Sequence, residues 1–189
     1  MKLYLARHGE TDLNIDDRYQ GVSDAPLNAR GIEQARALAA ALPLDVMRIV
    51  SSPLQRALQT AQAVGMARGL AVQTFAGLRE KDFGVFDGLS PAEVAARYPA
   101  LWRGGVLSSW DDAPPGGETP RAVVQRVSTC LDELHARHAD ETVLLVVHGF
   151  VIRALRYLID GLVESEFFDA PRLGNAEFLL REFVRDRRG

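Results

Sequence analysis

The sequence has a single cysteine, Cys130, and no apolar stretch of the length that a membrane-spanning helix requires. One cysteine excludes a disulfide bond within the chain. The short apolar run at the N-terminus is followed at once by charged Arg7 and Glu10, which is unlike a secretory signal peptide. We therefore expect a cytoplasmic protein that has no membrane partner.

An excess of basic residues is also missing, because the formal net charge is −3. Nucleic-acid binding needs lysine and arginine clustered on one face, so we expect no nucleic-acid partner and interpret the arginine-rich end, residues 185–188, as a solvated tail. Apolar residues make up 47% of the chain and charged residues 25%, which excludes long disordered or fibrous segments. The sequence leaves a monomer and a homodimer open.

Apolar runs and amphipathic stretches alternate along the chain. The runs predict strands at residues 2–6, 45–50, 71–75, 142–147 and 177–183. The amphipathic stretches predict the main helices near residues 32–42, 53–64, 91–98, 119–134 and 151–159. This alternation is typical of an α/β fold, here a three-layer αβα sandwich whose mainly parallel central sheet has helices on both faces.

The whole chain, residues 1–189, fits one domain of ordinary size. Glycine, proline and scattered aromatic residues between about 83 and 117 predict a small lid over the carboxyl ends of the strands. We expect a serine of the Ser51-Ser52 pair to cap the helix that contains Arg56, and Pro53 to open it.

Functional groups suited to phosphoryl transfer follow the predicted strands. Ligands bind beyond the carboxyl ends of open α/β sheets, which is where Arg7, His8 and His148 stand. Arginines such as Arg7 and Arg56 offer planar, permanently charged forks to phosphate oxygens. A neutral imidazole is an adequate nucleophile when a backbone carbonyl fixes its tautomer, and we expect Gly9 to let the backbone approach the phosphate closely.

Several short motifs extend this pattern through most of the chain. They are Arg7-His8-Gly9-Glu10-Thr11 with Asn14, Gln20-Gly21, Ser51-Ser52-Pro53-Leu54-Gln55-Arg56-Ala57, Leu78-Arg79-Glu80, Phe83-Gly84, Pro115-Gly116-Gly117-Glu118 and Val147-His148-Gly149. In this order they resemble the histidine phosphatase superfamily, which includes cofactor-dependent phosphoglycerate mutases and fructose-bisphosphatase domains. The compact length and the Pro-Gly-Gly-Glu segment resemble alpha-ribazole phosphatases and broad-specificity phosphatases most.

The resemblance implies a role for each matching residue. His8 would become phosphorylated, and Arg7, Arg56 and His148 would form the phosphate pocket. Glu80 would be the general acid for the leaving group and then the base for the water that hydrolyses the phosphohistidine. Further substrate contacts are implied for Asn14, Gln20, Gly21 and the backbone of Gly149. No cofactor is implied.

Two points about the proton donor stay open at this level. A glutamate acts as an acid near neutral pH only when burial or a neighbouring anion raises its pKa. Arg79 and Lys81 flank Glu80, so a surface salt bridge is the alternative to a catalytic role. Asp82 is a rival donor close by.

Three functions are open for a chain with these motifs. A phosphatase for a small phosphorylated metabolite is favoured over a phosphoglycerate mutase, because Phe150 stands where the mutase pattern has asparagine. The lid also lacks the paired arginines and lysine that grip a carboxylate and a second phosphate in mutases, and Arg97 and Arg103 are poor substitutes. A non-catalytic phosphate-binding regulator is disfavoured because every catalytic position is occupied.

A metal site is not expected, because closely spaced ligand pairs are missing except for His135 and His138 at a helix end. The identity of the substrate stays open. The aromatic residues of the lid and its flank would either line a pocket for a flat or apolar leaving group or pack on one another. They are Phe83, Phe86, Tyr98, Trp102 and Trp110.

Overall fold

The computed structural model describes residues 1–184, so the arginine-rich end at 185–189 lies outside the described residues. Within this part the strands are β1 Lys2–Arg7, β2 Arg48–Ser51, β3 Val72–Thr74, β4 Thr142–Val147 and β5 Phe178–Glu182. They form one sheet in the order β3-β2-β4-β1-β5. Only β5 runs antiparallel to its neighbour, which confirms the predicted mainly parallel sheet.

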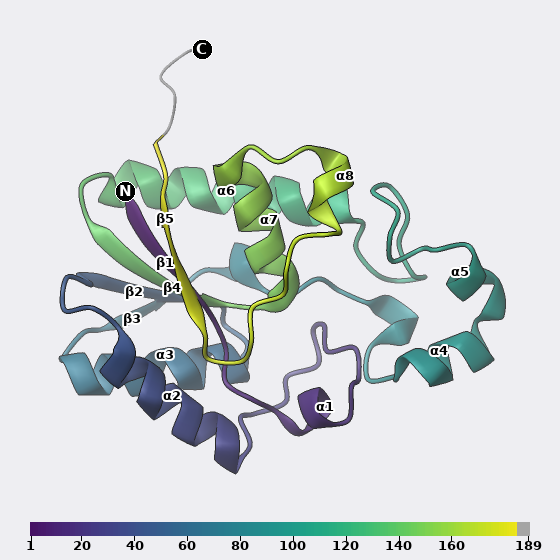
Figure 1. Cartoon of the computed structure of the whole chain (residues 1–189), viewed down its shortest axis with the longest axis horizontal. Coiled ribbons are helices and arrows are strands. Elements are labelled where there is room, and N and C mark those ends of the chain that lie inside the picture. The colour runs from purple at the N-terminus through teal and green to yellow at the C-terminus, as the bar shows by residue number, and fades with distance from the viewer. Residues whose placement is uncertain (185–189) are drawn as a thin grey trace.

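Helices cover both faces of this sheet, as the sequence predicts (Figure 1). One face carries α2 and α3, and the other carries α6, α7 and α8. The helices are α1 Asp12–Ile15, α2 Ala29–Ala41, α3 Gln55–Arg68, α4 Pro91–Arg97, α5 Pro99–Arg103, α6 Pro120–His138, α7 Gly149–Asp160 and α8 Glu164–Phe167, with single 3₁₀ turns at Ala76–Leu78 and Gly84–Phe86. None of these helices is both long and apolar enough to cross a membrane.

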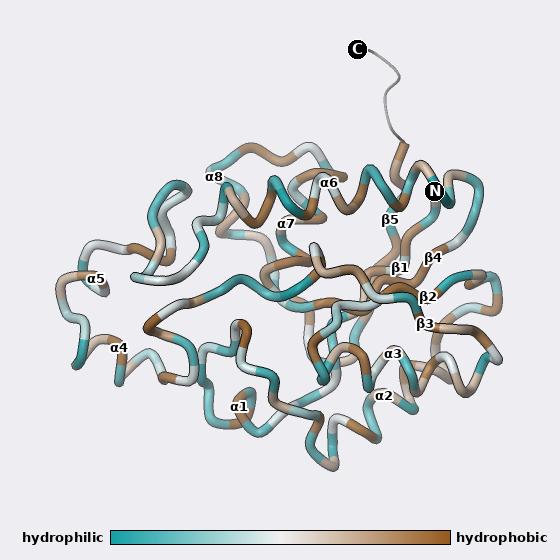
Figure 2. The backbone as a smooth tube through the Cα atoms, turned by 180° about the vertical axis from the view of Figure 1, so that it is seen from behind, coloured by the Kyte–Doolittle hydropathy of each residue, from teal (hydrophilic) through white to brown (hydrophobic). Residues whose placement is uncertain are grey.

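The core has two parts because successive side chains of a strand point to opposite faces of the sheet. Leu3 and Leu5 of β1 pack with α6 and α7, whereas Tyr4 and Ala6 pack with α2 and α3. Strand β4 alternates in the same way. Figure 2 shows that the central strands are made largely of hydrophobic residues. Buried on both faces, β1 and β4 are fixed firmly enough to hold the residues that follow them.

Helix α3 does not begin as predicted. Its N-terminal cap is Leu54, which offers no side-chain hydrogen bond, so the expected capping by serine and opening by Pro53 are wrong. The hydroxyl of Ser52 lies 3.3 Å from the backbone nitrogen of Leu54 but also 2.7 Å from the ring of His148. Ser52 therefore connects β2 to the residue that follows β4.

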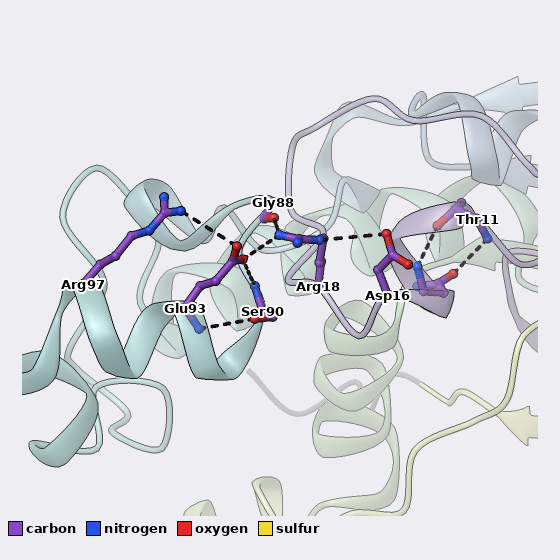
Figure 3. A network of polar contacts seen from close by, with 8 residues as sticks. Thr11, Asp16, Arg18, Gly88, Ser90, Glu93 and Arg97 are labelled. Atoms are coloured by element: carbon purple, nitrogen blue, oxygen red, sulfur yellow. Dashed lines mark hydrogen bonds and ion pairs between the residues drawn. The ribbon is translucent and has the colours of Figure 1, made fainter.

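The segment 83–117 stands apart from the sheet and carries α4 and α5 (Figure 1). It has a small apolar core of its own, built on Phe86, Val94 and Val106. Figure 3 shows how this segment is tied to the loop after α1. Arg18 donates to the carbonyl of Gly88 at 2.7 Å and to the carboxylate of Glu93 at 2.6 Å. These bonds tie α4 and the turn before it to the loop after α1.

Candidate active site

The strand order places the residues after β1, β2 and β4 next to one another. Strand β4 lies between β2 and β1, and Arg7 pairs with Val147 in the parallel register. His8 and His148 are therefore the next residues on two adjacent strands. Their ring centroids are 5.2 Å apart, although 140 positions separate them in the sequence. The predicted meeting of these two histidines is thus seen in the structure.

His8 is held in one tautomer. Its Nδ1 lies 2.7 Å from the carbonyl oxygen of Gly9. A carbonyl only accepts hydrogen bonds, so Nδ1 carries the proton and Nε2 keeps a free lone pair. Burial, and then the positive charges of Arg56 and Arg7, hold the pKa of His8 well below its usual value. The ring is therefore neutral near pH 7, as a nucleophile must be.

Packing against α2 leaves no room for a side chain at Gly9. A Cβ on Gly9 would lie 2.5 Å from the carbonyl oxygen of Gly31, and a Cβ on Gly31 would lie 2.1 Å from the carbonyl oxygen of Glu10. The close approach therefore joins the loop after β1 to the start of α2. Thr60 of α3 adds a further support by accepting a hydrogen bond from the Gly9 nitrogen at 3.0 Å.

His148 is fully buried and has one ring nitrogen with a partner. Its Nε2 lies 2.7 Å from the Ser52 hydroxyl, whereas Nδ1 has no hydrogen-bond partner among the described residues. Burial, then the charge of Arg56, holds the pKa of His148 well below its usual value. The ring is therefore neutral in the free protein.

Two arginines are held by backbone carbonyls. The Arg56 guanidinium donates to Ser23 and to Gly21, each at 2.8 Å, and that of Arg7 donates to Leu173 at 3.0 Å. The Nε atoms of both arginines are buried and have no partner within residues 1–184. Burial lowers the pKa of each, but an arginine pKa is high enough that both stay charged. In the described part of the chain neither cation has a carboxylate within salt-bridge distance, so both can bind an anion.

Glu80 is 7% exposed and makes no ion pair within the described chain, which removes the surface salt-bridge alternative. Its Oε1 accepts from the Lys81 nitrogen at 2.9 Å, and Oε2 accepts from the Phe150 nitrogen, in the first turn of α7, at 3.2 Å. These bonds and the charges of Arg56 and Arg7 favour the carboxylate, but burial outweighs them and raises the pKa of Glu80. The structure thus meets the condition for a proton donor.

These groups surround a cavity of about 830 Å³. Arg7, His8 and Glu80 line it, with Asn14, Gln20 and Gly149. Three predicted site residues are not on its surface. Arg56 and His148 are fully buried, and Gly21 uses its carbonyl to hold Arg56.

Two amides at the cavity wall have contrasting surroundings. The Asn14 oxygen accepts from the Thr11 nitrogen at 3.2 Å and from the Asn175 amide at 3.1 Å. The Gln20 oxygen accepts from the Thr11 hydroxyl at 2.9 Å, but its amide nitrogen is buried without a partner in the described part of the chain. Gln20 therefore has donor capacity to offer a ligand.

Asp82 is turned away from this cavity. Its carboxylate accepts from the Gly84 nitrogen at 2.8 Å, and it is not among the cavity residues. Within residues 1–184 no group of three or more histidine, cysteine, aspartate or glutamate side chains is arranged to hold a metal ion.

The aromatic residues divide between the two predicted uses. Phe83 and Trp102 line the cavity. Phe86 is fully buried against Tyr98, with ring centroids 5.5 Å apart, and so belongs to the small apolar core of the segment 83–117. Trp110 packs on Phe167 of α8, 4.9 Å between centroids.

The sequence pattern does not predict where three residues of this region lie. Ser52 follows a strand, but nothing in the sequence pairs it with His148. Arg153 lies on α7 and Arg172 between α8 and β5, and both line the cavity. An arginine on an amphipathic helix or in an irregular segment usually indicates a solvated surface, so neither carries a signal.

Comparison with known families agrees with this geometry. A family model described as histidine phosphatase superfamily (branch 1) matches residues 3–188. Phosphoserine phosphatase 1 of Hydrogenobacter thermophilus is 35% identical over 89% of this chain and 80% of its own length. A glucosyl-3-phosphoglycerate phosphatase of Mycolicibacterium vanbaalenii is 36% identical over 94% and 82%. Phosphoglycerate mutase-like protein 4 of Arabidopsis thaliana is 34% identical over 82% and 69%.

Solved structures give the same result. A mycobacterial glucosyl-3-phosphoglycerate phosphatase in complex with vanadate (VO3) superposes with a TM-score of 0.87 at 35% identity, covering 95% of this chain and 91% of that one. The alpha-ribazole phosphatase of Shigella flexneri superposes with a TM-score of 0.84 at 28% identity, covering 95% and 89%.

Proposed function

The chain belongs to the histidine phosphatase superfamily, branch 1, and is a phosphomonoester hydrolase; we propose that it acts through a phosphohistidine formed on His8. One observation carries this proposal. The Nδ1 proton of His8 is fixed on the Gly9 carbonyl, which leaves the Nε2 lone pair free beside a cavity that also holds Arg7 and Glu80.

In the first step Nε2 of His8 attacks phosphorus, and the bond from phosphorus to the leaving oxygen breaks. Glu80, whose pKa burial raises, gives its proton to that oxygen. Arg7 and Arg56 stabilise the charge on the non-bridging oxygens. The Ser52 hydroxyl lies 2.7 Å from Nε2 of His148. In the proposed mechanism it donates to Nε2, so that His148 carries its proton on Nδ1 and offers it to the phosphate as a further donor.

In the second step water attacks the phosphorus of the phosphohistidine. Glu80, now a carboxylate, takes a proton from that water, and the bond from Nε2 to phosphorus breaks. Inorganic phosphate leaves, and His8 is neutral again. Arginines supply the positive charge throughout, so we propose that catalysis needs neither metal nor cofactor.

The substrate is a small phosphorylated metabolite in this proposal. A cavity of about 830 Å³ holds more than a phosphoryl group, and Phe83 and Trp102 on its wall suit the body of a leaving group. Asn14, Gln20 and Gly149 complete the substrate contacts. We also propose that the chain forms one domain, with residues 83–117 as the lid over this site.

The test is hydrolysis of p-nitrophenyl phosphate in excess chelator, followed by rapid-quench labelling with a radioactive phosphate ester. We expect activity in chelator and a labelled adduct that is stable to alkali and lost in acid. His8→Ala should abolish both the activity and the adduct. His135→Ala, on the same kind of residue in α6, is the matched control. Chelator-sensitive turnover or an adduct that survives in His8→Ala would overturn the mechanism.

A further inference from the structure

Two arginines on the cavity wall have no acidic partner. Arg153 of α7 and Arg172 of the segment before β5 both line the cavity. Within residues 1–184 neither makes a hydrogen bond or an ion pair. Arg18, on the same wall, is different because Glu93 neutralises it at 2.6 Å. Asp17 and Glu80 are the carboxylates on this wall, and neither is within salt-bridge distance of Arg153 or Arg172, so the charge of these two arginines is not paired within residues 1–184.

Aromatic rings lie beside Arg153, and the charge of Arg172 acts on other residues of the cavity wall. The guanidinium of Arg153 lies 5.7 Å from the ring centroid of Phe150 and 5.8 Å from that of Phe167. The charge of Arg172 acts on Arg7 at one end of the cavity, on Tyr19 of the wall and on Arg153. Arg172 directly precedes Leu173, whose carbonyl accepts from Arg7.

Burial, and then the charge of Arg172, lower the pKa of Arg153, so the two cations repel each other. Glu80 and Asp169 act on Arg153 from farther away than salt-bridge distance, and Glu80 is needed for proton transfer. A phosphoryl group beside His8 occupies Arg7 and Arg56. The charge of Arg153 and Arg172 is therefore left for another part of the same ligand.

We propose that the leaving group of the substrate carries a second anionic group, a carboxylate or another phosphate, which binds between Arg153 and Arg172. This inference rests on the proposed phosphatase function and names the substrate class of that site. A planar guanidinium matches both anions, since each presents two oxygens to its fork. These two arginines come from α7 and the segment before β5. They do not come from the segment 83–117, where the resemblance to mutases would place the cations for a second anionic group.

The experiment uses pairs of phosphate esters that differ in one anionic group. 3-Phosphoglycerate is compared with glycerol 3-phosphate, and fructose 1,6-bisphosphate with fructose 6-phosphate. We expect kcat/KM to favour the more anionic member of at least one pair by about tenfold or more, the effect of one charge-assisted hydrogen bond. Preference within the first pair assigns a carboxylate, and preference within the second assigns a phosphate.

Arg153→Gln and Arg172→Gln should each reduce that preference by about tenfold, chiefly through KM, since they act on ground-state binding as well. Arg172 is exposed, so its variant keeps the test valid if Arg153→Gln folds poorly. Arg137→Gln, which removes an equal charge from the far end of α6, should leave the preference unchanged.

Equal turnover of both members of each pair, or an unchanged preference in both arginine variants, would overturn the anion subsite while leaving the phosphatase function intact. Failure of the function itself has a different signature, namely full p-nitrophenyl phosphatase activity in His8→Ala.

Discussion

The hydroxyl oxygen of Ser52 lies 2.7 Å from Nε2 of His148, so the residue after β2 holds the residue after β4. Ser52 also accepts a hydrogen bond from the Leu54 nitrogen at 3.3 Å. In our mechanism the hydroxyl donates its own proton to Nε2, and His148 then carries its remaining proton on Nδ1. In our mechanism this makes Ser52 a positioning residue that decides which nitrogen of His148 donates to phosphate.

Ser52→Ala should lower kcat by about tenfold, the usual cost of losing a group that orients an active imidazole, with a smaller change in KM. The reason is that Nε2 can then keep the proton and leave Nδ1 without one. Nitrogen chemical shifts of His148 report the tautomer directly. Ser51→Ala is the matched control, because the Ser51 hydroxyl donates to the Ser52 carbonyl at 2.8 Å and does not touch His148. An unchanged tautomer in Ser52→Ala would contradict the role.

Glu80→Gln should separate the two chemical steps. Turnover of an alkyl phosphate should fall by about 10²–10⁴-fold, the typical contribution of a general acid, because the leaving alkoxide needs a proton. p-Nitrophenolate leaves without one, but hydrolysis of the phosphohistidine still lacks its base. We therefore expect a burst of p-nitrophenol equal to the enzyme concentration, followed by slow turnover. Asp82→Asn serves as the comparison, and a burst in that variant instead would reverse the assignment.

Much of this site is predictable because it depends on strands that are buried on both faces. Strands β1 and β4 are apolar runs, and such runs end at a common edge when a sheet is parallel. That rule brings His8 to His148 without knowledge of any contact. Glu80 is harder, since charged neighbours on either side suggest a surface. Its burial depends on α7, whose Phe150 nitrogen bonds to its carboxylate.

Other parts of the site have no signal in the local sequence. Gly9 cannot carry a side chain, because a Cβ there would clash with the backbone of Gly31. Sequence periodicity does not reveal this contact between the loop after β1 and α2. The segment before β5 has no regular period, so Arg172, and Leu173 whose carbonyl holds Arg7, are invisible to pattern analysis. The sequence predicts that serine caps α3 and that Pro53 opens it, but the helix begins at Gln55. The pattern does not show that the Ser52 hydroxyl contacts the ring of His148 as well as the backbone.

Acid should destabilise the protein through its two buried imidazoles. His8 and His148 have folded pKa values well below 6.5, so below that pH the unfolded chain binds protons that the folded chain does not. Stability is thus full above pH 6.5 and falls as the pH decreases, by about 1.4 kcal/mol per pH unit for each histidine at most. Urea unfolding between pH 7 and pH 5 measures this slope.

Glu80 acts in the opposite sense, because its folded pKa is raised and its contribution is lost as the pH rises. Unfolding is therefore compared in the Glu80→Gln background, with and without His148→Gln. The second change should reduce the slope by about half, the share of one of two protons. The same slope in both proteins would show that His148 is not neutral in the folded state.

Replacing Lys81 should stabilise the protein. Lys81 is fully buried, and its ammonium group has no hydrogen-bond partner within the described residues. Burial lowers its pKa from 10.5 to about 8, in spite of the charges of Glu80 and Glu118. At 1.36 kcal/mol per pKa unit this difference costs about 3 kcal/mol near pH 7. The rings of Phe150 and Phe83, 4.8 and 5.6 Å from the ammonium nitrogen, offer only partial compensation.

Lys81→Met keeps the apolar chain and removes the charge, so we expect the free energy of unfolding at pH 7 to rise by about 1–3 kcal/mol. The size of this difference depends on pH. Because the folded pKa of Lys81 is depressed, the wild-type protein should gain stability between about pH 8 and pH 10.5, as the buried amine loses its proton. In Lys81→Met that gain should disappear, and the two unfolding curves should converge at the alkaline end. Lys2→Met, at the partly exposed lysine beside Asp45, is the control for loss of a positive charge. If Lys81→Met were less stable than the wild type at pH 7, the ammonium group would have to be stabilised by its surroundings rather than merely tolerated.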